Sequence, residues 1–121
     1  MKKKILILDD KETMVKVMSH YLSSDFDCVS FDNPIKGLEW LYEGNMPDLI
    51  LLDIRMPEMR GDEFLHIIKD NDMLKTIPVI MVSAEDNSEE RIRLLSEGAE
   101  DYITKPFNPM ELKIRISKVL R

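Results

Sequence analysis

The feature that most constrains the fold is an uninterrupted apolar run at residues 49–52, which Asp48 precedes and Asp53 follows. The run has no polar residue to present to water, so we expect a strand that is buried on both faces. Such strands belong to parallel sheets that helices cover on both sides. Asp53 then stands at the carboxyl end of the strand, where an open α/β sheet leaves a crevice for functional groups.

Four further apolar runs alternate with helical patterns along the chain. Strands are predicted at residues 5–8, 28–31, 79–82 and 102–103. A helix is expected after each strand, because apolar residues recur there at spacings of three and four. The residues expected on the inward faces of the first two helices are Met14, Val17, Met18, Tyr21, Leu22, Ile35, Leu38, Leu41 and Tyr42.

Five units of strand followed by helix predict an α/β fold with a parallel sheet and right-handed crossovers. A doubly wound sheet is the economical way to cover both faces. Asn87 or Ser88 is expected to cap the fourth helix, and Asn108 is expected to cap the last.

Composition limits the class of protein. The 121 residues suit one domain, and the net charge of −6 argues against nucleic-acid binding by this domain itself. Cys28 is the only cysteine, so the chain has no disulfide framework. No stretch has the pattern of a signal peptide or the length of a membrane span, and the expected location is cytoplasmic with no membrane contact.

Polar residues follow the predicted strands at their carboxyl ends. Asp9 and Asp10 follow the first strand, Asp53 the third, Ser83 the fourth and Lys105 the fifth. If the first, third and fourth strands are neighbours, three carboxylates share one pocket, which is unfavourable without a cation. Mg²⁺ suits such a set of oxygen ligands. A lysine and a hydroxyl opposite the metal could hold phosphoryl oxygens, which indicates phosphoryl transfer with Asp53 as the nucleophile.

Each of these residues also has an ordinary explanation. Asp9 and Asp10 could form the start of a helix, and Lys105 could be a solvated loop lysine. The functional interpretation depends on all five polar residues meeting at the same end of successive strands.

Four motifs occur together in this chain, namely Asp9-Asp10, Asp53-Ile54-Arg55-Met56-Pro57 with Gly61, Val82-Ser83-Ala84, and Lys105-Pro106-Phe107. With these motifs the chain resembles the receiver domain of two-component response regulators, the CheY-like family. The resemblance covers the whole chain and implies a flavodoxin-like sheet of order 2-1-3-4-5 with five helices on its two faces.

The resemblance implies a role for each site residue. Asp53 would accept a phosphoryl group from a sensor histidine kinase or phosphotransfer protein. Asp10, Asp53, the backbone carbonyl of Arg55 and, directly or through water, Asp9 would hold Mg²⁺. Lys105 would pair with the phosphoryl group. The implied role is that of a signalling switch and not of an enzyme.

The resemblance also implies a switch pair, Ser83 and Tyr102. The hydroxyl of Ser83 would move to the new phosphoryl oxygen, and the ring of Tyr102 would turn into the vacated space. The peptide bond between Lys105 and Pro106 is expected to be cis.

Two residues near the acceptor carry opposite charges. Arg55 lies two residues after Asp53, and Glu85 lies two residues after Ser83. We expect an ion pair that hinders the attacking water and so lengthens the life of the phosphoryl group. The alternative is two solvated side chains, since exposed pairs are weak.

Charges in the last third resemble the set with which winged-helix regulators of the OmpR/PhoB type dimerise. Arg91 would pair with Glu111 of the partner subunit, and Asp101 with Arg115 of the partner subunit. Ile92 and Leu95 would form the apolar centre of this homodimer face, made by the last two helices and the last strand.

Two departures weaken the dimer hypothesis. Ile114 stands where those regulators commonly have a small residue, and the basic partner expected for Glu100 would fall past Arg121. The alternative is a solvated charged face.

Other functions remain as alternatives. A phosphatase of the haloacid-dehalogenase type would need a second aspartate two residues after Asp53, where this chain has Arg55. A stand-alone receiver that signals by docking a partner protein is the main alternative to a receiver that controls a transcriptional effector.

Met1 followed by three lysines is typical of a natural start, whereas the abrupt end at Arg121 favours a receiver excised from a longer chain.

Overall fold

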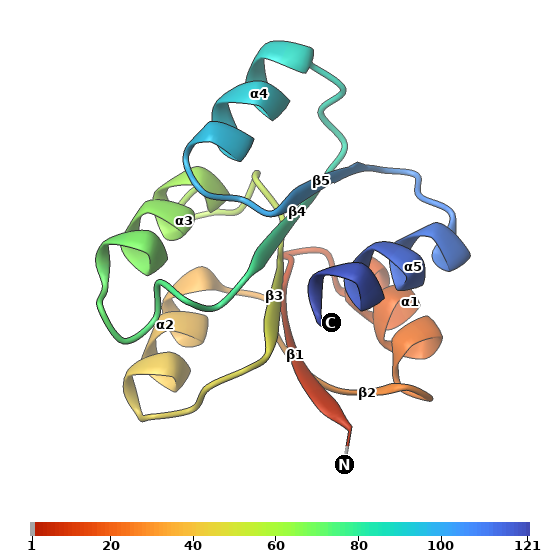
Figure 1. The fold of residues 1–121 in the computed structure, drawn as a ribbon, viewed down its shortest axis with the longest axis horizontal. Helices are drawn as coiled ribbons and strands as arrows, with labels where there is room; N and C mark the ends of the chain where they lie inside the picture. The colour runs from red at the N-terminus through yellow and green to blue at the C-terminus, as the bar shows by residue number, and fades with distance from the viewer. Residues whose placement is uncertain (1) are drawn as a thin grey trace.

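The computed structural model describes residues 2–121 and contains one five-stranded parallel sheet of order β2-β1-β3-β4-β5 (Figure 1). The expected flavodoxin-like order is therefore confirmed. The strands are β1 (Lys3–Leu8), β2 (Phe26–Phe31), β3 (Leu49–Leu52), β4 (Val79–Ser83) and β5 (Asp101–Thr104). The helices are α1 (Glu12–Leu22), α2 (Pro34–Tyr42), α3 (Gly61–Asp70), α4 (Ser88–Ser96) and α5 (Pro109–Val119).

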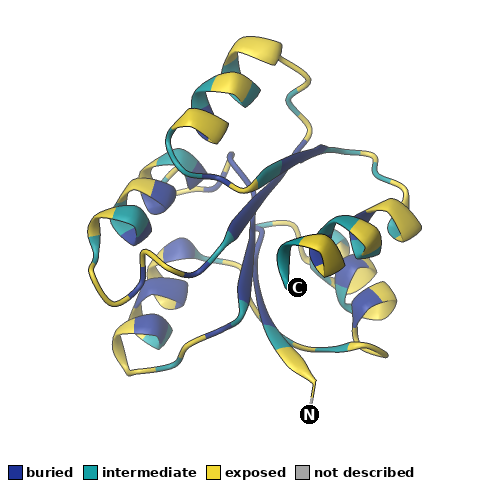
Figure 2. Cartoon of the chain, in the orientation of Figure 1, coloured by how far each residue is buried: buried dark blue, intermediate teal, exposed yellow. Residues whose placement is uncertain are grey.

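The sheet separates two apolar cores. Helices α1 and α5 cover one face, and α2, α3 and α4 lie on the other (Figure 1). Side chains of β1 alternate between the cores, with Ile5 and Ile7 in one and Leu6 and Leu8 in the other. Figure 2 shows the resulting pattern of buried central strands and helices that are exposed on their outer sides. Burial on both faces is the reason why the strands read as continuous apolar runs.

Several helix residues expected to face inward are exposed, and that prediction was wrong. Val17 is 43% exposed and Tyr21 is 41% exposed, because Met18 and Leu22, one residue further round the helix, take the buried row. Ile35 is 37% exposed, one residue into α2. Tyr42, which is 60% exposed, is the last residue of that helix. The apolar stripe of each helix is wider than the surface that the sheet can cover.

Three of the helices have an asparagine at the N-cap position. The side chains of Asn33, Asn87 and Asn108 each accept hydrogen bonds from two backbone N–H groups of the first helical turn. The expected cap at Asn108 is confirmed, and Asn87 rather than Ser88 caps α4. Four strands are longer than predicted, by one residue in β4 and by two residues in each of β1, β2 and β5. Within residues 2–121, no helix is long and apolar enough to cross a membrane.

One guanidinium connects α4 to α3. The Nη2 of Arg93 in α4 lies 3.3 Å from a carboxylate oxygen of Asp62 in α3 and 2.6 Å from one of Glu90. The Nη1 of Arg93 lies 2.9 Å from a carboxylate oxygen of Glu97. The carboxylates, Glu90 above all, hold the pKa of Arg93 above its usual value. Helix α4, which has only Leu94 fully buried, is thus held in part by charge.

Candidate functional site

The register of the sheet brings the predicted site residues to one edge. Leu8 of β1 is paired with Leu52 of β3, so the residues that follow, Asp9 and Asp53, leave the sheet at the same level. Ser83 ends β4 and is paired with Thr104, which places Lys105 directly after it on the neighbouring strand. Residues that lie far apart in the sequence therefore meet because their strands end together.

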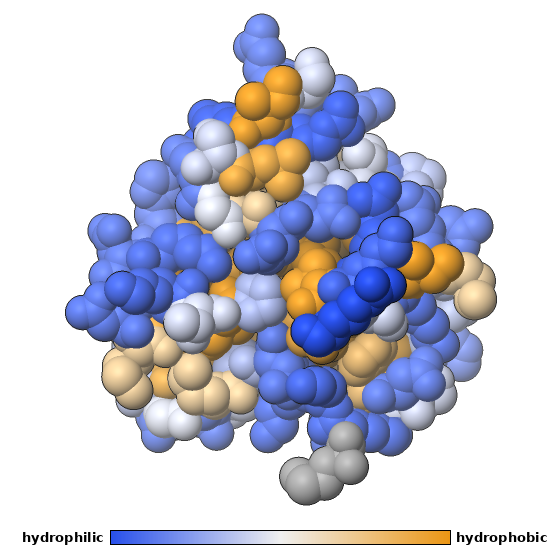
Figure 3. All heavy atoms as spheres, in the orientation of Figure 1, coloured by the Kyte–Doolittle hydropathy of each residue, from blue (hydrophilic) through white to orange (hydrophobic). Residues whose placement is uncertain are grey.

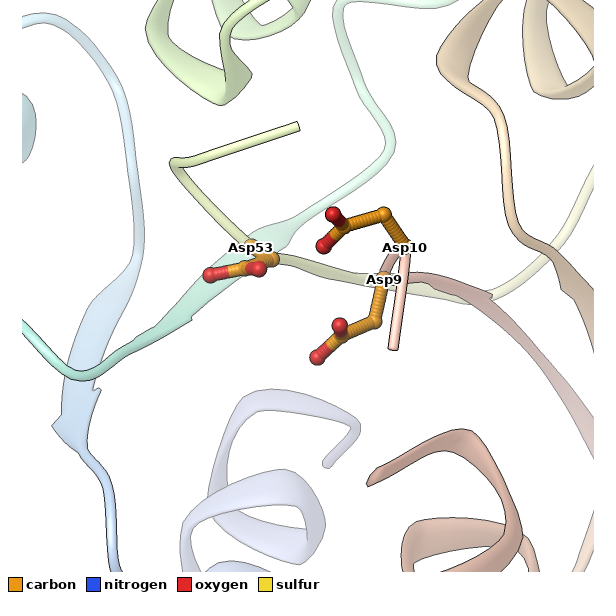
Figure 4. Close-up of side chains that lie close together, drawn as sticks. All are labelled: Asp9, Asp10 and Asp53. Carbon is orange, nitrogen blue, oxygen red and sulfur yellow. The ribbon is translucent and has the colours of Figure 1, made fainter. Parts of the chain in front are cut away.

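Three carboxylates converge at this edge (Figure 4). One oxygen from each of Asp9, Asp10 and Asp53 lies within 4.8 Å of the other two. Asp9 is 1% exposed and Asp53 is 6% exposed, so water screens their repulsion poorly. The Oδ1 of Asp10 is buried and has no hydrogen-bond partner among residues 2–121. A buried orphan oxygen beside two more carboxylates fits the oxygen ligands of a hard divalent cation such as Mg²⁺.

Lys105 supplies the positive charge found within the cluster. Its Nζ lies 2.7 Å from Oδ2 of Asp9 and 3.6 Å from Oδ1 of Asp53. The lysine side chain is only 9% exposed, which fixes the ammonium beside both carboxylates. One ammonium cannot neutralise three carboxylates, so the cluster keeps an excess of negative charge. The peptide bond between Lys105 and Pro106 is cis, as expected.

The environment of Asp53 makes its carboxyl harder to ionise than that of a free aspartate. Burial is the main cause that raises the pKa of the Asp53 carboxyl, and the nearby Asp9 and Asp10 raise it further. Lys105 and the Ile54 N–H, which donates to Oδ1 of Asp53 over 2.9 Å, lower that pKa but do not outweigh burial. A cation bound here would favour the ionised form, which is the nucleophilic one.

Gly61 allows α3 to begin directly against the loop that follows Asp53. A Cβ at residue 61 would lie 2.9 Å from the Cα of Ile54 and closer still to the carbonyl oxygen of Asp53. The Gly61 N–H donates to the Ile54 carbonyl over 2.7 Å. Only glycine fits this close backbone approach, which explains why Gly61 accompanies the Asp53 motif.

The predicted switch residues are connected through the backbone of Glu85. The buried hydroxyl of Ser83 accepts a hydrogen bond from the Glu85 N–H over 3.2 Å. The Tyr102 hydroxyl donates to the Glu85 carbonyl over 2.7 Å, and the tyrosine is 5% exposed. Burial raises the pKa of Tyr102, so the phenol keeps its proton at neutral pH. In this structure the tyrosine ring is therefore already in the inward position.

Arg55 and Glu85 form the ion pair that the sequence predicted. The Nε of Arg55 lies 2.5 Å from Oε1 of Glu85, while the arginine side chain is 77% exposed. The pair lies at a pocket of about 330 Å³ that Asp53, Ser83 and Lys105 also line. The effect of this pair on phosphoryl lifetime stays a prediction.

Lys11 lines the same pocket and was not among the predicted site residues. Its only sequence signal was its place directly after Asp10. A lysine at the start of a helix reads as an ordinary surface residue.

The expected dimer face presents exposed apolar side chains. Ile92 is 65% exposed and Leu95 is 40% exposed, and Figure 3 shows apolar surface where Figure 1 places α4. In this chain, however, Arg115 binds Asp101 over 2.9 Å and Glu111 over 2.9 Å within the same subunit. The predicted pairing of Asp101 with Arg115 of the partner subunit would require these contacts to exchange. The homodimer stays a prediction.

Comparison with known proteins decides the family. A family model described as the response regulator receiver domain matches residues 5–117. The chain belongs to this family. The acidic cluster of this receiver domain of two-component response regulators consists of Asp9, Asp10 and Asp53, the residues that the sequence motifs indicated.

The receiver is similar to several known proteins. It is 38% identical to the phosphate regulon transcriptional regulatory protein PhoB of Escherichia coli (strain K12), over 100% of this chain and 53% of PhoB. It is 34% identical to the alkaline phosphatase synthesis transcriptional regulatory protein PhoP of Bacillus subtilis (strain 168), over 100% of this chain and 50% of PhoP. The receiver thus spans about half the length of these curated relatives.

A solved structure has the same fold. The chemotaxis response regulator CheY4 of Vibrio cholerae superposes on the receiver with a TM-score of 0.89 and 26% sequence identity, covering 99% of this chain and 100% of CheY4. The doubly wound architecture and its helices are therefore those of CheY-like receivers.

The raised pKa of Asp53 predicts a specific dependence of stability on pH. The folded receiver binds the Asp53 proton more tightly than the unfolded chain, so this stabilising contribution is lost as pH rises through the folded pKa. Asp53→Asn removes the ionisation, and we expect it to raise the free energy of unfolding by on the order of 1 kcal/mol at neutral pH without Mg²⁺. The gain should shrink toward zero as pH falls toward the ordinary range of aspartate.

Urea unfolding of both proteins, from about pH 4 in the ordinary range of aspartate to about pH 7, measures this difference. Asp27→Asn, on the exposed face of β2, is the matched control and should change little. An Asp53→Asn protein that is less stable than the parent at neutral pH, or a gain independent of pH, would contradict the account.

Proposed function

We propose that the receiver is the phosphoacceptor of a two-component phosphorelay. Asp53 accepts a phosphoryl group from a sensor histidine kinase or a phosphotransfer protein in the cytoplasm. The observation that carries the proposal is the meeting of Asp9, Asp10, Asp53 and Lys105 at one edge of the sheet. Family membership supports the location and the kind of donor.

The residues of the site divide the chemistry between them. An ionised oxygen of Asp53 attacks the phosphorus of the donor phosphohistidine, the new O–P bond forms as the P–N bond breaks, and the imidazole leaves with the electron pair. Lys105, between Asp9 and Asp53, is placed to neutralise the incoming phosphoryl oxygens. The role is that of a switch modified by its partner, not of an enzyme acting on a separate substrate.

Mg²⁺ fits the acidic cluster. Asp9, Asp10, Asp53 and the backbone carbonyl of Arg55 would hold it, with Asp9 acting directly or through water. When bound, Mg²⁺ supplies the positive charge that lets the carboxylates and a phosphoryl group occupy one site.

The signal would leave through the face formed by α4, β5 and α5. Ser83 moves its hydroxyl to the new phosphoryl oxygen and releases the Glu85 N–H, which alters the backbone that holds the Tyr102 hydroxyl. Because only a few kcal/mol separate such states, one new hydrogen bond and charge can repopulate them. Residues proposed for a homodimer on this face are Arg91, Ile92, Leu95, Asp101, Glu111 and Arg115.

The effector is proposed to be transcriptional, because the curated relatives PhoB and PhoP are named as transcriptional regulatory proteins. The alternative is a stand-alone receiver that signals by docking a partner protein. In either case residues 1–121 act as one receiver domain that does not itself contact nucleic acid, in keeping with the net charge of −6.

Phosphorylation with a small donor tests the proposal. Incubation with acetyl phosphate and Mg²⁺ should add one acid-labile phosphoryl group, detected by intact mass, and Asp53→Ala should abolish the addition. Beryllofluoride with Mg²⁺, followed by light scattering after size exclusion, should convert the receiver to a dimer. Absence of any adduct on the parent protein would overturn the phosphoacceptor role, whereas an adduct without a dimer would favour the docking alternative.

The ion pair beside the pocket generates a second prediction. If Arg55 and Glu85 shield the acyl phosphate from water, Arg55→Ala should shorten its half-life about two- to fivefold, since exposed pairs are worth only about 1 kcal/mol or less. Glu85→Gln should have a similar effect, and the double variant should add little to either. The measurement is loss of the adduct after the donor is removed.

Additive effects of the two substitutions would show that the residues act separately. An unchanged or longer half-life in Arg55→Ala would refute the shielding hypothesis.

A further inference from the structure

Three basic residues line the pocket at Asp53, and they differ in their partners. Lys105 is bound to Asp9, and Arg55 is bound to Glu85. Lys11, which lines the same pocket, has no carboxylate within 4.0 Å among residues 2–121. Its ammonium is thus the one basic group of the pocket that no acidic side chain of the described chain neutralises.

Lys11 also occupies a position where a lysine is locally unfavourable. It is the N-cap of α1, and its side chain makes no capping hydrogen bond. A cation at a helix N-terminus opposes the helix dipole, and lysine has no acceptor for the free N–H groups. The chain places asparagine at the same position of α2, α4 and α5.

The other helix without a side-chain cap provides a contrast. Arg60 is the N-cap of α3, but its guanidinium lies 3.1 Å from Asp62 and 3.8 Å from Glu90. Arg60 therefore has an electrostatic reason for its place within the fold. Lys11 lacks such a partner, and local exceptions of this kind concentrate at functional sites.

The backbone of Lys11 is held at the acidic cluster. Its N–H donates to Oδ1 of Asp9 over 2.9 Å, and Oδ2 of the same carboxylate binds Lys105 over 2.7 Å. Lys11 is exposed and lines the pocket, so its long side chain is free to change conformation there while its backbone stays fixed. A flexible lysine side chain on a fixed backbone can contact an anion that enters the pocket.

Charge balance shows what this ammonium would do. With a divalent cation bound, the three carboxylates and Lys105 carry no net formal charge, and Arg55 and Glu85 cancel each other. The receiver as a whole carries −6, which repels anions. Lys11 is then the uncompensated charge at the entrance to the pocket.

We propose that Lys11 recognises free acyl phosphates, whose phosphoryl group is a dianion, and draws them to Asp53. This inference rests on the proposed phosphoacceptor function. In the reaction, the Asp53 oxygen forms the new O–P bond while the P–O bond to the acyl group breaks, and the carboxylate leaves with the electron pair. Lys11 contacts the incoming donor and takes no proton.

The test measures the second-order rate constant of phosphorylation by acetyl phosphate with Mg²⁺ at low and high ionic strength. Lys11→Gln should lower the constant about threefold at low salt, and Lys11→Glu about tenfold, because the net charge becomes more negative by one unit and by two units, respectively. The differences should fade at high salt as the charges are screened. Phosphoramidate, which carries less negative charge, should show a smaller effect.

The matched control is Lys16→Gln, which removes an exposed lysine from the same helix that pairs with Glu12 and is absent from the pocket. It should react at the parent rate. Urea unfolding should show that Lys11→Gln is as stable as the parent or more so, since the cation at the N-cap is unfavourable.

Two failures are distinguishable. If the parent protein gains no adduct, the phosphoacceptor function fails. If the parent is modified but Lys11→Glu reacts at the same rate at low salt, or reacts more slowly by the same factor at all salt concentrations, the recognition role of Lys11 is overturned.

Discussion

Mutual repulsion among three carboxylates, two of which belong to buried residues, is the constraint on which the rest of this structure depends. Asp9, Asp10 and Asp53 are held within 4.8 Å of one another by two central strands that end at the same level. The apolar sheet holds the backbone of these residues in place, because β1 and β3 each contribute side chains to both cores. Lys105 offsets part of the charge, and the remainder makes the site responsive to cations and to phosphoryl groups.

The same edge is connected physically to the surface that would carry the signal. Gly61 packs on the backbone after Asp53, and the next residue, Asp62, binds Arg93 of α4. On the other side, the backbone of Glu85 contacts both Ser83 and Tyr102. Helix α4 is thus bound through Asp62 to the helix that packs on the acceptor loop, and it begins shortly after Glu85 in the chain. Spatial connection of this kind identifies residues for coupling measurements and is not itself a measure of coupling.

Most of the fold was predictable because strands buried on both faces consist of continuous apolar residues, which are easy to recognise in a sequence. Residues 49–52 were best explained as a strand with two covered faces, and the order of strands and helices then limited the topology. The meeting of Asp9, Asp53 and Lys105 also followed from strand ends. The helix faces were less predictable, since Val17 and Tyr42 are apolar but exposed, and hydrophobicity alone does not say how much of a stripe is covered.

Parts of the site lay beyond sequence reasoning for a different reason. Whether Arg115 pairs within its own chain or across a dimer depends on side-chain geometry, and here it pairs with Asp101 of its own chain. Lys11 carried no pattern that marks it, because its significance lies in the partners that it lacks. The ion pair of Arg55 and Glu85 was predictable only because two motifs fixed the positions of both residues.

A Mg²⁺ titration of thermal unfolding tests the central claim most directly. At constant ionic strength, Mg²⁺ should raise the melting temperature of the parent protein, with about 2.7 kcal/mol of added stability at a concentration 100 times the dissociation constant. Asp10→Asn, which replaces the orphan oxygen by an amide, should lose most of this gain, while Asp27→Asn should keep it. A parent protein that Mg²⁺ does not stabilise, or an Asp10→Asn protein that it stabilises equally, would contradict the account of the acidic cluster.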